Sequence, residues 1–289
     1  MMAISLFMRK IGFVFILGFV LILSCKKKSN PEPAPGPDII GQEGDTCRIR
    51  KASYGLYQNI IYEYAGGKVS KVILQIDGNE YPGVLEYDSG GKLTKVKGLH
   101  VDTSYEYDSK GRLIKENRTL HNEGVYTLIP HWEARIFEYN NDNQVAKCSY
   151  VEGRGTNYNS FYVKKGEVYK YETYLYNFQG CVEKMESYER TPSSTIFYRT
   201  VYIYQYDKLI NPFYGHPGIY DIKTYFGADS GNGVLTFSKH NVVKVTMMNG
   251  TSENAVYSYS TTKYPLSAVN VYWQENRFPN LSFEYVNCK

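Results

Sequence analysis

The sequence predicts an all-β protein built as a long antiparallel meander of hairpins. A short hairpin-like stretch recurs along the chain, and the chain has 30 tyrosines in 289 residues. No stretch shows a sustained apolar period of 3.6 residues with capping residues at its ends, so helices are not expected. Because a flat sheet of this many strands is disfavoured, we expect a strong twist that curls the meander toward an open barrel.

The clearest hairpin is Tyr105–Lys115. Two tyrosines flank a glutamate, which is the alternation of a strand ending at Tyr107. Asp108 then suits the first position of a turn, because its carboxylate accepts backbone N–H groups further on, and Gly111 can take a positive φ. Leu113 begins the return strand. The spacing fits a type I turn closed by a glycine bulge.

Similar hairpins are expected before and after this one. The other strong and fair copies are centred on Tyr62-Glu-Tyr64, Leu85-Glu-Tyr87, Phe137-Glu-Tyr139 and Tyr174-Leu-Tyr176. Weaker copies are Tyr202-Ile-Tyr204, Tyr257-Ser-Tyr259 and Phe283-Glu-Tyr285. The interval between copies varies, as expected if insertions lie in the connections.

Apolar residues of the return strands stand three apart, as in Val69 and Val72 or Leu93 and Val96. On a regular strand such a pair faces opposite sides of the sheet. Either a bulge restores the phase or both faces are partly covered. The many tyrosines favour the second interpretation, since their rings cover a wide face while the hydroxyls stay in water.

The pattern Tyr-x-Tyr-Asp-x-x-Gly-Arg/Lys-Leu resembles the YD repeat of Rhs-type cell-envelope proteins. It also resembles a group of bacterial lipoproteins of unknown function built from such repeats. The resemblance covers Tyr62 to Tyr285 and is most specific in Leu85–Val96 and Tyr105–Lys115. It implies an antiparallel β-architecture and no catalytic residues.

Residues 1–24 are predicted to be a signal peptide. Arg9 and Lys10 precede an uncharged, mostly apolar run from Ile11 to Leu23, which is short for a membrane span. The run ends in Leu-Ile-Leu-Ser before Cys25, which resembles a bacterial lipobox. The resemblance implies that Cys25 carries a lipid and becomes the new amino terminus. The alternative is an uncleaved anchor helix that contains an ordinary cysteine.

Residues 25–45 are predicted to be a tether and residues 46–289 a single β domain. Four prolines within Pro31–Pro37 make the tether stiff and extended. The lysines at 26–28 follow the lipid anchor directly and can lie against anionic headgroups. We expect an outer-membrane lipoprotein, and the sequence leaves open whether it faces the periplasm or the cell surface.

After Cys25 the chain has four cysteines: Cys47, Cys148, Cys181 and Cys288. They allow three pairings, and four unpaired thiols are an equal alternative in a domain of this size. The spacing has no C-x-x-C, so a zinc site is not expected. No motif indicates a cofactor. The formal net charge is only +4, with Arg9 and Lys10 in the signal peptide, so a nucleic-acid partner is not expected.

Two segments depart from the repeat, residues 117–132 and 205–241. They are rich in aromatic residues, and long loops on a rigid sheet often carry binding sites. The structural alternative is that these aromatics fill the ends of the curled sheet. The candidate ligand-binding residues are Trp132, Tyr214, His216 and Trp273.

We therefore expect a non-enzymatic envelope lipoprotein that presents a tyrosine-rich surface to a glycan or a protein partner. One alternative is a hydrolase whose two carboxylates lie in the irregular loops, since a carboxylate pair can cleave a glycan without a recognisable motif. Another is a purely structural envelope component. An aromatic strip on the surface would favour glycan binding, whereas a cleft with two carboxylates would favour the hydrolase.

Overall fold

The computed structural model describes residues 47–54, 58–98, 101–120, 132–152, 166–190, 196–214, 237–261, 263–273 and 276–288. All of them belong to the second of two compact units, Pro33–Lys289. The predicted signal peptide, the tether with Cys25, and His216 lie outside the described residues. Within these ranges, no helix is both long and apolar enough to cross a membrane.

The described residues form strands joined by turns. The strands are β1 (Arg48–Tyr54), β2 (Gln58–Ala65), β3 (Lys68–Ile76), β4 (Asn79–Tyr87), β5 (Leu93–Gly98), β6 (Val101–Tyr107), β7 (Leu113–Leu120), β8 (Trp132–Tyr139), β9 (Val145–Glu152), β10 (Val168–Tyr176), β11 (Val182–Arg190), β12 (Phe197–Ile210), β13 (His240–Met247), β14 (Ser252–Asn254), β15 (Val256–Tyr259), β16 (Pro265–Trp273) and β17 (Asn276–Val286).

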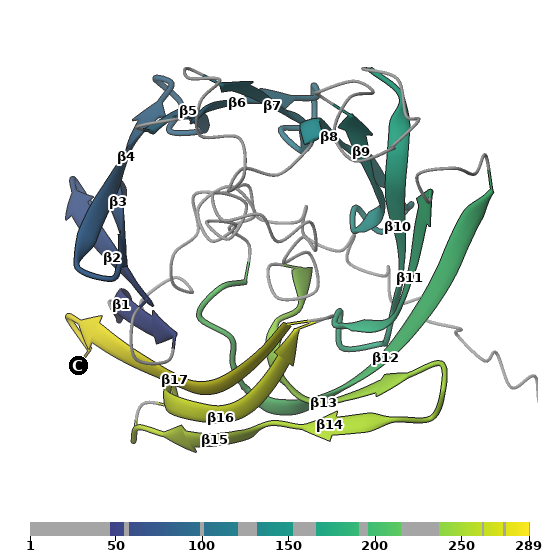
Figure 1. The fold of residues 1–289 in the computed structure, drawn as a ribbon. Coiled ribbons are helices and arrows are strands. Elements are labelled where there is room, and N and C mark those ends of the chain that lie inside the picture. Colours follow the sequence, from purple (N-terminus) through teal and green to yellow (C-terminus); the bar gives the residue numbers. More distant parts are fainter. Residues whose placement is uncertain are drawn as a thin grey trace, which may run out of the picture. The chain divides into compact units, whose positions relative to one another are not determined.

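Each strand pairs antiparallel with its neighbour in sequence from β1 to β14 and from β15 to β17. β17 then pairs with β1, from Arg48 opposite Val286 to Tyr54 opposite Leu281, so the meander returns to its start (Figure 1). The apolar side of the sheet faces the inside of this barrel. The structure confirms the predicted all-β meander curled into an open barrel.

The barrel has one seam, between β14 and β15. β14 pairs with β13 and β15 pairs with β16, and the chain passes from one ladder to the other at Ala255. Side chains cross the seam: the Tyr259 hydroxyl donates to the carboxylate of Asp207, and the amide of Asn241 donates to the Tyr259 hydroxyl. The last contact between β12, β13 and β15 is therefore polar rather than a backbone ladder.

A disulfide joins Cys47, just before β1, to Cys288, just after β17. It fastens the two ends of the domain beside the ladder that closes the barrel. Cys148 and Cys181 are buried free thiols. Burial raises the pKa of both thiols, so both stay protonated and unreactive.

A bulge precedes the second tyrosine of each hairpin. In the third copy Glu106 pairs with Lys115 but Tyr107 pairs with Leu113, which leaves the intervening Ile114 as the extra residue. The same shift occurs in the other hairpins. The bulge restores the phase, so that Val69 and Val72 are both buried. The interpretation that both sheet faces are covered is therefore wrong for these pairs.

The second tyrosine of each hairpin links it to the hairpin before it. The Tyr107 hydroxyl donates to the carbonyl of Leu93 at 2.7 Å, and the Tyr139 hydroxyl donates to that of Leu113 at 2.7 Å. Equivalent bonds are made by Tyr64, Tyr87, Tyr176, Tyr206 and Tyr285. In the sixth hairpin this role belongs to Tyr206, so centring that copy on Tyr204 was wrong.

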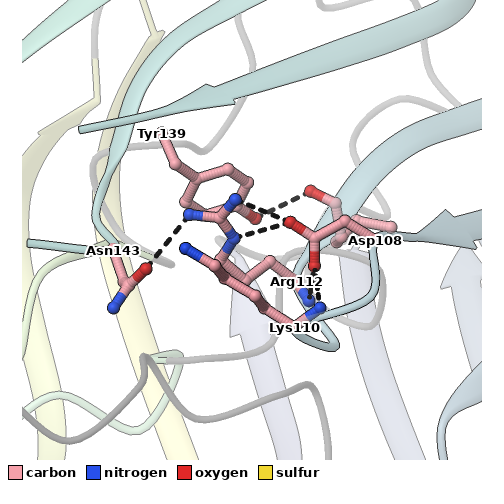
Figure 2. Close-up of polar contacts among 6 residues, drawn as sticks. Asp108, Lys110, Arg112, Tyr139 and Asn143 are labelled. Atoms are coloured by element: carbon pink, nitrogen blue, oxygen red, sulfur yellow. Dashed lines mark hydrogen bonds and ion pairs between the residues drawn. The ribbon is translucent and has the colours of Figure 1, made fainter. Parts of the chain in front are cut away.

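A cation from each early turn covers the tyrosine of the next hairpin. The Arg112 guanidinium lies 4.5 Å from the centre of the Tyr139 ring, donates to Asp108 at 2.7 Å and donates to Asn143 at 3.0 Å (Figure 2). Arg48, Lys68 and Lys92 cover later tyrosines in the same way. The residues of the repeat therefore link neighbouring hairpins in addition to forming the turns.

Candidate binding surface on the outer wall of the barrel

The outer wall of β2–β9 carries rows of paired charges. The glutamate between the two tyrosines of a hairpin faces outward, opposite a lysine of the return strand. Glu63 lies 3.7 Å from Lys71 and Glu138 lies 2.8 Å from Lys147. A barrel wall that faces lipid is apolar, and charges at its middle are costly. This part of the wall therefore faces water.

The outer wall is different on β10–β12, where three aromatic rings lie in contact. Tyr171 lies directly opposite Tyr188 in the ladder, and their rings stack at 4.6 Å with an angle of 11° between them. Phe197 packs its ring against Tyr171 at 5.1 Å. By the alternation of their strands, these residues lie on the side opposite the buried Tyr174 and Met185. We call Tyr171, Tyr188 and Phe197 the outer aromatic cluster.

Charged groups surround the outer aromatic cluster. The Lys147 ammonium lies 5.4 Å from the Tyr171 ring centre, and the Arg190 guanidinium lies 4.9 Å from that of Phe197. Each cation also has an acidic partner: Lys147 pairs with Glu138, and Arg190 pairs with Glu167 at 3.2 Å. The cluster is therefore an apolar patch with hydrogen-bonding groups at its edge and balanced charge.

Glu186 is the polar centre of this surface. It accepts hydrogen bonds from Tyr188 at 2.6 Å and from Arg199 at 2.5 Å, and it pairs with Lys184 at 2.6 Å. The hydrogen bonds from Arg199, Lys184 and Tyr188 lower the pKa of Glu186 to about 2. The carboxylate is thus ionised at any physiological pH and can accept hydrogen bonds from a ligand.

A second charged group lies inside the barrel on β7–β10. Glu116, Arg135, Tyr150 and Lys170 are successive partners across the four strands. Arg135 donates to Glu116 at 2.6 Å, and Lys170 lies 3.2 Å from Glu172. The four charged residues Glu116, Arg135, Lys170 and Glu172 are all buried. Together with Tyr150 they are called the interior ionic row below.

The interior ionic row holds its carboxylates in fixed partnerships. The Glu172 carboxylate accepts the hydroxyls of Tyr150 at 3.1 Å and Tyr174 at 2.5 Å in addition to its contact with Lys170. The other carboxylate of the row, Glu116, is held by Arg135. These two carboxylates lie on strands rather than in irregular loops. They therefore fit a buried structural network better than an acid–base pair.

The sequence did not single out these two groups of residues. Glu172 stands two residues before Tyr174, in phase with the inward tyrosines, and that phase could have revealed it. Tyr171 and Tyr188 stand in the opposite phase, which could have placed them on the outer wall. Their meeting depends on the register of β10 with β11, which the turn 177–181 and the bulge beside it set. In the described part of the chain, no cluster of three His, Cys, Asp or Glu side chains is placed to hold a metal ion.

Of the four residues proposed from the sequence, only Tyr214 has a described side chain. Tyr214 lies half-buried in the turn after β12, and its burial raises its pKa. Trp132 begins β8 and Trp273 ends β16, but their side chains are outside the described residues. His216 lies outside them as well. Their role in binding stays a prediction.

The repeat tyrosines do not form the expected tyrosine-rich surface. Tyr62, Tyr105, Tyr174 and Tyr202 are buried in the core. Their partners Tyr64, Tyr107 and Tyr176 pack against that core and use their hydroxyls on backbone carbonyls. The outer aromatic cluster lies outside the repeat pattern, as do the exposed Phe178 and Tyr198.

Comparison with known proteins identifies the fold but not a family. No family model matches the sequence, and no curated protein does. The chain is similar to the crystal structure of a porin-like protein from Bacteroides uniformis, with a TM-score of 0.50 and 11% identity over 88% of this chain and 99% of that one. At this identity the similarity is one of fold.

Two further solved structures show weaker similarity. A porin-like protein from Bacteroides vulgatus gives a TM-score of 0.49 with 11% identity, over 83% of this chain and 99% of that one. A Photorhabdus luminescens Tc holotoxin pore gives a TM-score of 0.32 with 12% identity, over 80% of this chain and 13% of that one. The chain therefore has an all-β barrel fold like that of the Bacteroides uniformis porin-like protein.

Proposed function

We propose that this protein is a non-enzymatic binding protein of the cell envelope, lipid-anchored at Cys25, which binds a neutral glycan through its outer aromatic cluster. The observation that carries the proposal is the cluster of Tyr171, Tyr188 and Phe197, half-buried on the outer wall beside strands that carry rows of paired charges. Clustered aromatics on the surface of a soluble domain mark interaction sites.

The chemistry of the patch fits a sugar. A sugar presents apolar C–H groups and a rim of hydroxyls. The aromatic rings supply the apolar contact, while Glu186 accepts hydrogen bonds and Arg190 and Arg199 donate them. The ion pairs around the cluster cancel one another's charge. A neutral glycan therefore matches the patch better than a strongly acidic one.

The envelope location rests on the sequence of the first 45 residues. The apolar run of 11–23, the cysteine at position 25 and the proline-rich tether fit an exported, lipid-anchored protein. The disulfide between Cys47 and Cys288 supports an oxidising compartment. The fold similarity supports nothing further about location.

The test is a glycan array probed with the fragment Pro33–Lys289, which contains every described strand and the disulfide. We expect the fragment to retain neutral glycans, and Tyr171→Ala with Phe197→Ala to weaken binding at least about 10-fold, because aromatic residues dominate binding energy. Leu175→Ala is the matched control: it is exposed on the same strand but lies outside the cluster.

Three results would contradict the proposal. The fragment could retain no glycan, the double variant could bind as well as the wild type, or Leu175→Ala could weaken binding equally. Circular dichroism spectra of all variants must overlay, so that a folding defect is not read as lost binding. Retention of a protein partner instead of a glycan would favour the other kind of ligand expected from the sequence.

A further inference from the structure

We infer that the rim of the barrel formed by the hairpin turns docks on the surface of an anionic lipid bilayer. We call this the turn rim; it comprises residues 66–67, 88–92, 108–112, 140–144, 177–181, 207–211, 239–241, 260–261 and 263–264 together with Cys47 and Cys288. The inference rests on the proposed lipid anchor for its orientation, but its test does not require the lipid.

The topology brings these turns to one rim. In an antiparallel meander, alternate connections lie at opposite ends of the strands. β1 begins beside the end of β17, so Cys47 and Cys288 lie at the same end as the turn that follows Tyr64. The chain that leads to Cys25 therefore leaves from the turn rim. The turn rim is therefore the end of the barrel nearest in sequence to the proposed anchor.

The turn rim exposes lysines at several turns. The exposed ones are Lys110, Lys208, Lys239 and Lys263. The acidic residues of the same turns are mostly engaged: Asp108 accepts Arg112 and backbone N–H groups, and Asp207 accepts Tyr259 and Asn241. Asp88, which accepts a turn N–H group, Asp142 and the neighbouring Glu183 are exposed acids. Among the described residues, the four exposed lysines therefore stand against two exposed acids within the rim and one beside it.

Phe178 is the second observation that points to a lipid surface. It lies at the tip of the turn between β10 and β11, and 97% of its surface is exposed. An exposed aromatic ring beside lysines is the combination that binds the interfacial region of a bilayer. Lys239 lies against the same turn, since its Cε atom would be 3.7 Å from a Cβ placed on Gly180.

An anionic surface attracts lysines, with an effect that falls off within a Debye length. In the described part of the opposite rim, the exposed charged residues include Asp77, Glu80 and Glu189 alongside Lys97 and Arg199. With the turn rim toward the headgroups, the outer aromatic cluster stays free on the side wall.

The experiment measures sedimentation of the fragment Pro33–Lys289 with vesicles of phosphatidylcholine, with and without phosphatidylglycerol. The fragment lacks Cys25, so any binding comes from the folded domain. We expect binding only to vesicles that contain phosphatidylglycerol, and we expect it to weaken as salt is added. Lys110→Gln with Lys208→Gln and Lys239→Gln should lower the partition coefficient on the order of 100-fold.

The matched control removes three lysines from the outer wall: Lys71→Gln, Lys115→Gln and Lys147→Gln. It changes the net charge equally and should lower the partition coefficient much less. Phe178→Ser should reduce binding several-fold without changing the salt dependence. The inference is overturned if the fragment does not bind anionic vesicles, binds neutral ones equally, or loses as much binding in the wall variant. Lipid labelling of Cys25 tests the anchor separately.

Discussion

At the residue scale, Gly111 shows why the turn requires glycine. Its φ is +80°, a region that side chains with a Cβ rarely adopt. A Cβ at this position would also lie 3.1 Å from the Lys92 ammonium, which covers the Tyr107 ring. The sequence predicted the positive φ, and the structure confirms it. The contact with the preceding hairpin is a second reason that only the folded structure reveals.

Gly111→Val should therefore destabilise the domain by at least about 1 kcal/mol, because a β-branched residue resists positive φ and its side chain would displace Lys92. The free energy of unfolding from urea titration measures the effect. Ser109→Ala, at an exposed position of the same turn, is the control and should change stability little. An unchanged denaturation midpoint for Gly111→Val would contradict this account of the turn.

Cys25→Ala tests the anchor, which lies outside the described residues. The apolar segment before it is too short to span a bilayer. We expect the variant to incorporate no radiolabelled palmitate and to leave the membrane fraction. Ser24→Ala keeps a small residue before the cysteine and should behave as the wild type. Equal labelling of Cys25→Ala and wild type would show that the lipobox resemblance is misleading.

At the scale of the element, each hairpin is held to the one before it by a tyrosine hydroxyl. Tyr107→Phe removes the bond to the Leu93 carbonyl and keeps the buried aromatic ring. It should cost about 0.5–1.5 kcal/mol of unfolding free energy, the net value of one hydrogen bond. Tyr171→Phe on the outer wall is the control and should cost less. A Tyr107→Phe variant as stable as the wild type would mean that water replaces the lost donor.

Glu186 lies in the ladder between β11 and β12, and it should make the stability of the domain depend on pH. Its folded pKa of about 2 lies below the ordinary glutamate value of 4.5, so folding favours the ionised form. The resulting stability is present above the unfolded pKa and is lost as pH falls from 4.5 toward 2. Its size is modest because the group is partly exposed and its ion pairs are screened by solvent.

Glu186→Gln should therefore flatten the acid limb of the stability profile below pH 4.5. Thermal melts at a series of pH values measure this limb. Glu183→Gln, an exposed neighbour on the same strand, is the control and should leave the limb unchanged. If the two variants lose stability in parallel with the wild type as pH falls, then the ion pairs with Arg199 and Lys184 do not form in solution.

At the scale of the whole molecule, closure of the barrel brings together the two ends of the domain. The disulfide between Cys47 and Cys288 spans a sequence separation of 241 residues and lies beside the ladder of β1 with β17. Cys47→Ala with Cys288→Ala should lower the unfolding free energy by about 2–5 kcal/mol, because a long loop in the unfolded chain is no longer constrained. Denaturant titration with and without reductant measures the loss.

Reductant should destabilise the wild type by the same amount and leave the double variant unchanged. Cys148→Ala is the control for loss of a thiol, although it also leaves a small cavity in the core. A wild type insensitive to reductant would contradict a stabilising role for this disulfide.

The sequence by itself determined the all-β class, the hairpins and their turns, because each of these depends on residues within one short stretch. Asp108 and Gly111 set their turn through their own carboxylate and backbone conformation. The pattern was less informative about the sixth hairpin, where an insertion between Asp207 and Asn241 separates the two halves of one turn. For the return strands it left two alternatives, and the favoured one, that both faces are covered, was wrong because a bulge restores the phase.

Only the tertiary structure decided which residues meet. The seam contact of Tyr259 with Asp207 joins residues 52 positions apart. The outer aromatic cluster and the interior ionic row join consecutive strands, but three or four of these strands must pair in register before all of their members meet. The pairing of β17 with β1 closes the meander, and this closure is a property of the complete barrel rather than of any one repeat.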